Sequence, residues 1–586
     1  MVDPAEAARW GIAPGFHDVF GVWHETTPRA REALTTAIGR GRISPADAVQ
    51  SGDATRAYQC GDRRMWGLAV QLYALRSSRN WGHGDFADLA ALVDMLAPMG
   101  CSAIGLNPLH ALFLERPEDA SPYSPNSRIF LNPLYIAVDH VPDCPDAASL
   151  GIAAKLAEVR AADQVRYADV AALKLSALRA GYLRFRNDAH DARRGDFETY
   201  RAEGGEALQR FAAFEVLRRR CGPAPWWEWP PDWRRPSSPA IARLFDDPTP
   251  EDDPLFHIYL QWLAARQLQQ CQDHARRRGM PIGLYIDLAV GVDPAGADAW
   301  SAQDEMLTGV SVGAPPDEYN RAGQNWGLTG YNPQALIASH GEPLRRMLDA
   351  VMRHAGAIRI DHILGLMRLF LIPRGTTAAD GAYVGYPFAL LLDVIVDESL
   401  RRCCVVIGED LGTVPDGFRE ALARRGLWSY QVMLFEREHG GGFRHPSHYR
   451  ADALTTFNTH DLPTFAGWIT GHDLRTKRAL DIDPGESDEA RAHSRSMLAA
   501  AIRGMGEGID GVAAFLAQTP ARLVMVALED VLGLEDQVNI PGTTSEHPNW
   551  RRRVPLDVDA LARHEGLKSV AAIFAQAGRA PDSAND

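Results

Sequence analysis

Three short β-prone or apolar segments, each with an acidic residue at or just past its end, constrain this chain more than any other feature of its sequence. AIRID ends at Asp361, VVIGE ends at Glu409 and TTFNTHD ends at Asp461. Successive acids are about 50 residues apart, which leaves room for a strand, a helix and the next strand. Acids at the C-terminal ends of successive parallel strands face one mouth of a barrel, where active sites of that fold lie. The pattern therefore predicts an α/β fold, a (β/α)8 TIM barrel, with the three acids at one site.

Eight β-prone segments can supply the strands of this barrel. They are Trp66–Leu75, Cys101–Leu106, Ile282–Val290, Ala357–Ile360, Val405–Gly408, Tyr430–Phe435, Leu454–Phe457 and Leu523–Ala527. An amphipathic helix, FADLAALVDMLAPMG, follows the first strand, and Asp85 is placed to cap it. Asp252, Asp253 and then Pro254 predict the start of a second strong helix before the third strand.

The length of 586 residues exceeds what one hydrophobic core supports, since single cores stop growing near roughly 250–300 residues. We expect a short helical N-terminal extension, a barrel, and a C-terminal helix with a disordered tail, at residues 1–61, 62–553 and 554–586. A mainly helical subdomain is expected as an insertion at about 139–280. Val312–Asn332 is rich in Gly and Pro and predicts a structureless lid loop at 312–332.

Within the insertion, Trp226–Trp233 (WWEWPPDW) concentrates four tryptophans among prolines. Indole rings stack well on flat sugar faces, so the cluster is a candidate sugar-binding surface. The other interpretation is a Trp–Pro plug that packs the insertion on the barrel. The sequence favours the plug, because no polar site lies beside the cluster.

Charge and cysteine content exclude several kinds of function. The formal net charge of −14 argues against nucleic acid and anionic membranes as partners. The seven cysteines are scattered without a CxxC pair, so neither a zinc site nor a disulfide framework is indicated. The sequence starts without a signal-peptide pattern and contains no apolar run long enough for a membrane span. We expect a cytoplasmic protein with no metal and no cofactor.

The three acidic segments resemble the catalytic segments of the amylomaltases, the 4-α-glucanotransferases of glycoside hydrolase family 77 in the α-amylase superfamily. The motifs are RIDH, GEDLG and THDLPT, and the resemblance extends to SPYS–NPL, GAPPD–GQNWG and the terminal QVNIPGTTSEHPNWRRR, over about 66–553. It implies transfer of α-1,4-glucan segments from a maltooligosaccharide donor to an acceptor, glucose included. Two departures stand out: Ile286 precedes Asp287, and Ile363 and Leu364 follow RIDH where many members have Phe-Arg.

Cleaving a glycosidic bond with retention requires two carboxyls about 5–5.5 Å apart, one ionised and one protonated. Arg359 precedes Asp361 by two residues, so both side chains point to the same side of a strand. A guanidinium lowers a carboxyl pKa, which favours Asp361 as the nucleophile. Glu409 follows an apolar strand, where burial and nearby anions should raise its pKa. Glu409 is therefore the expected acid/base.

The resemblance implies roles for further residues around the donor sugar. Asp461 would hold ring hydroxyls and stabilise the transition state, and His460 would add a hydroxyl contact. Tyr123 of SPYS would lie under the donor sugar as an aromatic platform. Asp287, inside an apolar run, would hydrogen-bond Arg359, and a buried acid needs such a partner.

On the acceptor side, the resemblance implies that Asn325 and Trp326 of the lid contact the acceptor sugar. A lid that excludes water and binds an acceptor favours transfer over hydrolysis. Two other functions remain open from the sequence: an α-1,4-glucan hydrolase, and a glucan-binding barrel without catalysis. Two residues next to the acids have expected structural roles. Asp410 is expected to cap the next helix, and His362 is as well explained as a core or supporting histidine as by a substrate contact.

Overall fold

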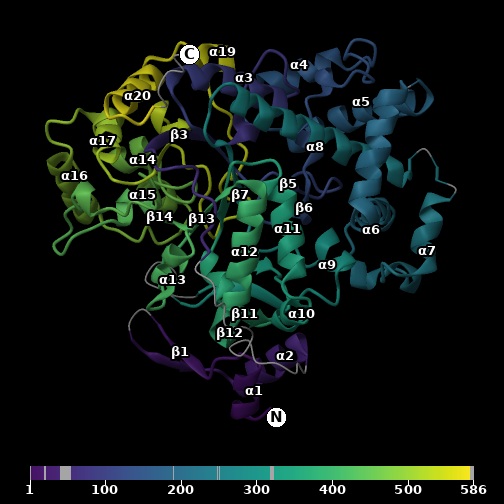
Figure 1. The fold of residues 1–586 in the computed structure, drawn as a ribbon, viewed down its shortest axis with the longest axis horizontal. Helices are drawn as coiled ribbons and strands as arrows, with labels where there is room; N and C mark the ends of the chain where they lie inside the picture. The colour runs from purple at the N-terminus through teal and green to yellow at the C-terminus, as the bar shows by residue number, and fades with distance from the viewer. Residues whose placement is uncertain are drawn as a thin grey trace.

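A closed barrel of eight parallel strands forms the centre of the molecule (Figure 1). The computed structural model describes residues 2–18, 21–39, 55–188, 190–246, 248–249, 251–316 and 323–580. The barrel strands are β3 (Met65–Val70), β4 (Ala103–Leu106), β7 (Gly283–Leu288), β10 (Ala357–Ile360), β13 (Val405–Gly408), β14 (Trp428–Val432), β15 (Ala453–Thr456) and β16 (Leu523–Ala527). The last strand pairs with the first, and the predicted (β/α)8 barrel is confirmed.

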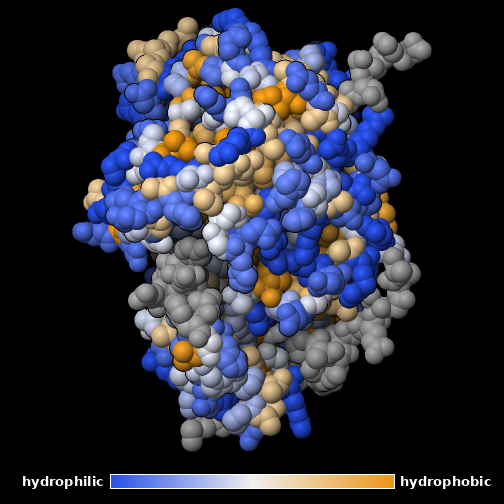
Figure 2. Space-filling model, turned by 90° about the vertical axis from the view of Figure 1, so that its left-hand side faces the viewer, coloured by the Kyte–Doolittle hydropathy of each residue, from blue (hydrophilic) through white to orange (hydrophobic). Residues whose placement is uncertain are grey.

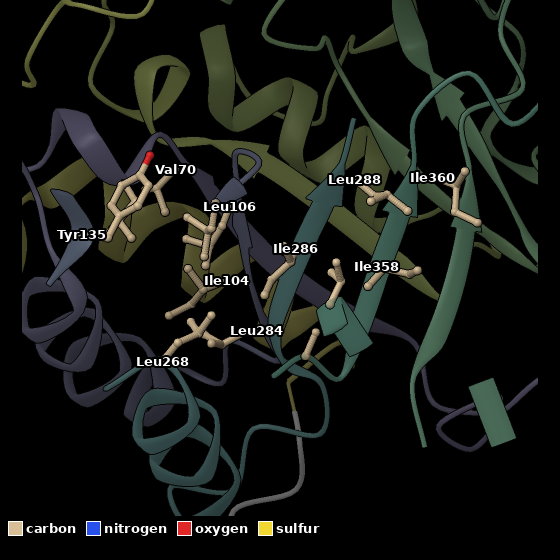
Figure 3. Packing of buried hydrophobic residues seen from close by; sticks show 14 of the residues in the cluster. Val70, Ile104, Leu106, Tyr135, Leu268, Leu284, Ile286, Leu288, Ile358 and Ile360 are labelled. Atoms are coloured by element: carbon tan, nitrogen blue, oxygen red, sulfur yellow. The ribbon is translucent and has the colours of Figure 1, made fainter. Parts of the chain in front are cut away.

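Alternation along each strand separates the barrel interior from the helix layer. Figure 3 shows Leu284, Ile286 and Leu288 of β7 and Ile358 of β10 among the apolar side chains that pack outside the strands. The intervening residues point inward, as expected for a period of two. Arg359 and Asp287 are among these, and the register of β10 and β7 places them directly opposite each other.

Twenty helices of the described residues surround the barrel and form the subdomains. They are α1 (Pro4–Arg9), α2 (Pro28–Ile38), α3 (Phe86–Leu96), α4 (Ala153–Ala161), α5 (Tyr167–Asp188), α6 (Asp191–Cys221), α7 (Pro239–Ala242), α8 (Pro254–Arg277), α9 (Ala297–Ser301), α10 (Pro333–Ala338), α11 (Glu342–Met352), α12 (Phe388–Arg402), α13 (Phe418–Arg424), α14 (Phe465–Thr470), α15 (His472–Ala479), α16 (Asp488–Ala501), α17 (Gly508–Ala517), α18 (Leu528–Val531), α19 (Val558–Leu561) and α20 (Glu565–Gln576). Asp85 caps α3 and Asp253 caps α8 through their carboxylates, as the sequence predicts.

The helices α4–α8 form the insertion between β4 and β7, and α5–α7 extend to the right of the barrel in Figure 1. The tryptophan cluster joins this insertion to the rest of the chain. Trp229 is 1% exposed and packs against Phe214 and Trp300, while Trp226 Nε1 donates a hydrogen bond to the carbonyl of Pro294. These contacts support the packing interpretation for Trp226 and Trp229.

The expectation of a structureless loop at 312–332 is wrong at both ends. Residues Val310–Ala314 form β8 and Gln324–Leu328 form β9, and the two strands pair antiparallel. With β11 (Arg368–Pro373) and β12 (Ala382–Gly385) they make a four-stranded sheet, which we call the lid sheet. Pairing with neighbouring strands satisfies the backbone N–H and C=O groups of residues that the Gly- and Pro-rich composition had assigned to a loop. Residues 317–322 of the expected loop lie outside the described residues.

The N-terminal extension contains a β-hairpin in addition to the expected helices. Strands β1 (Gly15–His17) and β2 (Trp23–Glu25) pair antiparallel, and Phe16 packs edge-on against Phe370 and Tyr383 of the lid sheet. The expected helices are present as α1 and α2, and the hairpin is an addition that the sequence did not predict. Its strands are three residues long, too short for an alternating pattern to mark them.

At the other end of the chain, α20 is the expected C-terminal helix, and residues 581–586 of the expected tail lie outside the described residues. Among the helices that are described, none combines the length and apolarity needed to cross a membrane. Figure 2 shows that hydrophilic residues dominate the side of the molecule at the left of Figure 1, with apolar residues in scattered spots.

Candidate active site

Arg359 occupies the centre of the candidate site, between two carboxylates. Its Nη1 lies 2.9 and 2.7 Å from the two carboxylate oxygens of Asp287, and its Nη2 lies 3.0 Å from Oδ1 of Asp361. Asp287 comes from β7 and Arg359 from β10, and both are 6% exposed. The expected contact between Asp287 and Arg359 is present, and the same guanidinium also contacts Asp361, two residues further along the chain.

Glu409 lies beside Asp361 because two neighbouring strands end at the same level. The register pairs Ile360 with Gly408, the last residues of β10 and β13, so Asp361 and Glu409 directly follow the two strands. The backbone N–H of His362 donates a hydrogen bond of 2.9 Å to Oε2 of Glu409. His362 has a φ of 48°, a left-handed conformation that is uncommon outside glycine and is often found at functional sites. The sharp turn after Asp361 therefore brings an amide to the Glu409 carboxylate.

Burial dominates the protonation of both carboxyls. It raises the pKa of Asp361 to about 6, even though the Arg359 guanidinium acts in the opposite direction. The expectation that Arg359 keeps the pKa of Asp361 low is therefore wrong, because the sequence does not reveal how far the surrounding barrel shields the carboxyl from water. A pKa of about 6 still leaves Asp361 mainly ionised at neutral pH. Burial also raises the pKa of Glu409, as expected.

Asp461, His460 and Tyr123 form a second group at the same mouth. His460 Nε2 lies 3.3 Å from Oδ2 of Asp461, and the Tyr123 ring stacks on the His460 ring at 4.7 Å. The Tyr123 hydroxyl donates a hydrogen bond of 2.5 Å to Asp287, which connects this group to Arg359. Desolvation raises the pKa of Asp461, but His460 and Asn539 outweigh it, so the net pKa lies below its ordinary value.

The sequence pattern does not reveal the residues that hold Asp461 in place. Asn539 Nδ2 donates a hydrogen bond of 2.6 Å to Oδ1 of Asp461, and Gln537 Nε2 donates one of 2.8 Å to the Asp461 carbonyl. Trp550 packs on the rings of both Tyr123 and His460. All three belong to QVNIPGTTSEHPNWRRR, the terminal motif to which the sequence assigned no role at the site. The polar residues of that motif were the only sequence feature that could have indicated a role at the site.

Asp410 does not cap a helix, so that expectation is wrong. Its carboxylate accepts hydrogen bonds from the Ser429 hydroxyl and the Tyr430 amide, both on β14, and pairs with Arg419. Gly417 holds the N-cap position of α13 instead. Asp410 therefore ties the end of β13 to the next strand, directly beside Glu409.

The two predicted acceptor residues point in different directions on β9. The Trp326 ring meets the His362 ring edge-on at 5.3 Å, which places Trp326 next to the turn that follows Asp361. The Asn325 side chain accepts hydrogen bonds from Ser311 and from the amide of Gly327, and it is exposed. The structure thus brings Trp326, but not the Asn325 side chain, into contact with the group around Asp361.

No cluster of three or more His, Cys, Asp or Glu suited to a metal ion occurs in the part of the chain that the structure describes. The polar groups of the site instead are paired carboxyls, one guanidinium and aromatic rings. A closed parallel barrel with carboxyls at the carboxyl ends of its strands defines a barrel enzyme with acid chemistry at its mouth.

The chain belongs to the 4-alpha-glucanotransferase family, glycoside hydrolase family 77, whose sequence profile matches residues 70–558. A 4-alpha-glucanotransferase of Mycobacterium tuberculosis is 38% identical over 524 residues, covering 84% of this chain and 71% of the relative. One of Haemophilus influenzae is 36% identical over 547 residues, covering 87% and 78%. The predicted family and enzyme class are therefore confirmed.

Solved structures agree with this assignment. The amylomaltase of Corynebacterium glutamicum superposes with a TM-score of 0.84 at 27% identity, covering 97% of this chain and 99% of that one. The amylomaltase of Streptococcus agalactiae, solved in complex with acarbose, gives a TM-score of 0.73 over 89% of this chain and 100% of that one. At 19% identity, the second likeness concerns the fold alone.

Proposed function

We propose that this enzyme transfers α-1,4-glucan segments between maltooligosaccharides, with glucose among its acceptors, through a covalent glycosyl-enzyme. In this proposal Asp361 is the nucleophile, Glu409 the acid/base and Asp461 the stabiliser of the transition state. The observation that carries it is the register of β10 and β13, which puts Asp361 and Glu409 side by side. Paired carboxyls with different environments are what a retaining mechanism requires.

In the first step, the Asp361 carboxylate attacks the anomeric carbon of the donor, and the glycosidic bond breaks as Glu409 gives its proton to the leaving oxygen. The leaving glucan departs with that proton. In the second step, Glu409 removes a proton from an acceptor hydroxyl, whose oxygen attacks the same carbon and releases Asp361. Arg359 holds Asp361 in position through its contact of 3.0 Å.

Asp461 and His460 would hold hydroxyls of the donor ring, and Tyr123 would provide its aromatic platform. The fixed position of Asp461, bound at one oxygen by Asn539, supports this role because preorganised groups stabilise a transition state most effectively. Trp326, next to His362, would contact the acceptor. For Asn325 we propose only a backbone or rim contact, since its side chain bonds within the lid sheet.

Incubation of the pure protein with maltotriose tests the reaction. We expect glucose together with a ladder of longer glucans, and a constant number of reducing ends. Hydrolysis would instead raise the number of reducing ends and yield glucose and maltose as the final products. That second outcome would refute transfer as the main activity.

The variant Glu409→Gln tests the assignment of the acid/base. It should lower turnover of maltotriose at least about a thousandfold, since acid–base catalysis and the covalent step both depend on this group. Oligosaccharide binding, measured by calorimetry, should persist. The matched control is Glu420→Gln, an exposed acid on α13, which should leave turnover unchanged.

We also propose a cytoplasmic location, which the seven free thiols of the chain support.

A further inference from the structure

A polar hollow extends from the mouth of the barrel into its interior. It has a volume of about 80 Å³, and Tyr123 and His460 are among the residues that line it. Three register neighbours on β16, β3 and β4 line it: Ala527 pairs with Ala69, and Ala69 pairs with Gly105. Branched bulky residues fill the interior of most barrels of this type. Here three adjacent positions carry at most a methyl group, and space remains beside them.

Several polar atoms that line this hollow have no partner among the described residues. They are Oε1 of Gln71, the hydroxyl of Tyr285 and Oδ2 of Asp530. Glu529 also lines the hollow and is 8% exposed. Its carboxyl accepts a hydrogen bond from its own backbone amide, and a carboxyl group has capacity for further hydrogen bonds. Buried polar atoms are nearly always hydrogen-bonded in folded proteins. The unpaired atoms therefore indicate an occupant that forms hydrogen bonds.

The chemistry of the lining identifies the class of the occupant. Amide and carboxyl oxygens accept hydrogen bonds, and the Tyr285 hydroxyl can accept or donate, so the occupant must be a hydrogen-bond donor. Burial raises the pKa of Glu529 and Asp530 to about 7, which fits a neutral occupant better than a cation. Sugar hydroxyls and water meet both conditions. Two other lining residues, Tyr123 and His460, are the ones proposed to surround the donor ring.

We propose that the hollow receives a hydroxyl group of the donor glucose and that Glu529 is a further substrate-recognition residue, hydrogen-bonded to that hydroxyl. Gln71 faces the same space and assists in the contact. This inference rests on the proposed function, because it assigns a substrate group to the same site. Asp530 instead supports the loop that carries His460, since its Oδ1 accepts hydrogen bonds from Asn458 and the Phe465 amide at either end of that loop.

The test is a cycle that combines variants with modified donors. The donors are maltotriosyl fluoride and its 2-, 3- and 6-deoxy analogues at the ring that bears fluorine. Fluoride release reports kcat/KM for the first step and does not require transfer. One deoxy donor should react about tenfold or more slowly with the wild-type enzyme, because a site built for a hydroxyl is left with unpaired groups. With Glu529→Leu, that same deoxygenation should cost no more than about twofold.

Glu529→Gln keeps the shape of the side chain, so it provides a second measurement if the leucine variant does not fold. It should show an intermediate loss with the intact donor, and Glu420→Gln serves as the exposed control. If each deoxygenation costs the same in the wild type and in both Glu529 variants, the hollow holds only water and the proposal is wrong. A wild type that releases fluoride but never forms longer glucans would refute the proposed transfer alone. A wild type that releases no fluoride would refute both.

Discussion

At the scale of single residues, Asn539 is the group that most directly fixes Asp461. Its amide donates a hydrogen bond of 2.6 Å to the carboxylate and helps to keep the pKa of Asp461 low. Removing it with Asn539→Ala should lower kcat roughly 10- to 100-fold, since hydrogen bonds to charged groups contribute about 1.5–3 kcal/mol. Steady-state kinetics with maltotriose checks this. Thr544→Ala, exposed in the same segment, is the control, and equal kinetics for both variants would contradict the prediction.

Arg359 and burial act in opposite directions on Asp361, which leads to a prediction about pH. The nucleophile must be ionised, and its pKa is about 6, so kcat/KM should rise with pH through that value. In Arg359→Lys, a single ammonium cannot keep contacts to both Asp287 and Asp361. The pKa of Asp361 should then rise further, and activity at pH 5.5 should fall at least about threefold more than at pH 7.5. Profiles of kcat/KM between pH 4.5 and 8 measure this, and an unmoved acidic limb would contradict it.

Local pattern was enough to predict where the acids lie, but not what controls them. Asp361 and Glu409 each follow a short β-prone run, and such runs are visible in a few residues of sequence. The contact between Asn539 and Asp461 spans 78 residues and leaves no local pattern. The raised pKa of Asp361 depends on burial by many elements at once, and the flanking Arg359 alone suggested the opposite direction.

At the scale of elements, β9 presents alternate residues to opposite sides, so its two predicted acceptor residues should differ in function. Trp326→Ala should lower transfer to glucose about tenfold and increase the share of hydrolysis, because an aromatic face next to His362 is lost. Asn325→Ala is the matched control on the same strand, and it should change transfer less than about twofold. The ratio of longer glucans to new reducing ends measures both. Similar ratios in the two variants would refute this division.

The barrel strands were easier to predict than the lid sheet, for a physical reason. Buried parallel strands are continuous apolar runs, and the predicted bounds of Val405–Gly408 and Leu523–Ala527 agree with β13 and β16. The strands of the lid sheet contain glycines and prolines, which normally mark loops. Gly327, with a φ of 70°, lies within β9 itself. Pairing with distant strands, rather than local propensity, determines that region.

At the scale of the whole molecule, Glu215 connects the insertion to the loop that carries Tyr123. It lies on α6 and accepts a hydrogen bond of 2.6 Å from Asn126, and burial raises its pKa to about 8. The folded protein therefore keeps a proton that the unfolded chain releases above its ordinary value of 4.5. Stability is lost as pH rises through this range, by up to about 1.4 kcal/mol per pH unit for one such group.

Glu215→Gln retains the oxygen that accepts from Asn126 and removes the titration. The free energy of unfolding, measured with urea at pH 5.5 and pH 8, should fall less between these values in the variant than in the wild type. The pH dependence of the unfolding free energy that remains in the variant comes from groups such as Glu529 and Asp530. Burial raises the pKa of these two groups as well. Glu203→Gln, exposed on the part of α6 before its kink at Gly205, should retain the wild-type slope. If Glu215→Gln also retains the wild-type slope, Glu215 is not a source of the pH dependence of stability.

The pairing of β16 with β3 also has a consequence for how the molecule is made. One member of that pair begins at Met65 and the other ends at Ala527, and Arg579 then bonds to the carbonyls of Met65 and Ala521. A ribosome must therefore release most of the polypeptide before the ring of strands can shut. Until then the nascent chain carries two unpaired strand edges, and strands of neighbouring chains can pair with them. Shielding during translation should thus matter more to this protein than to one whose sheet pairs neighbours in sequence.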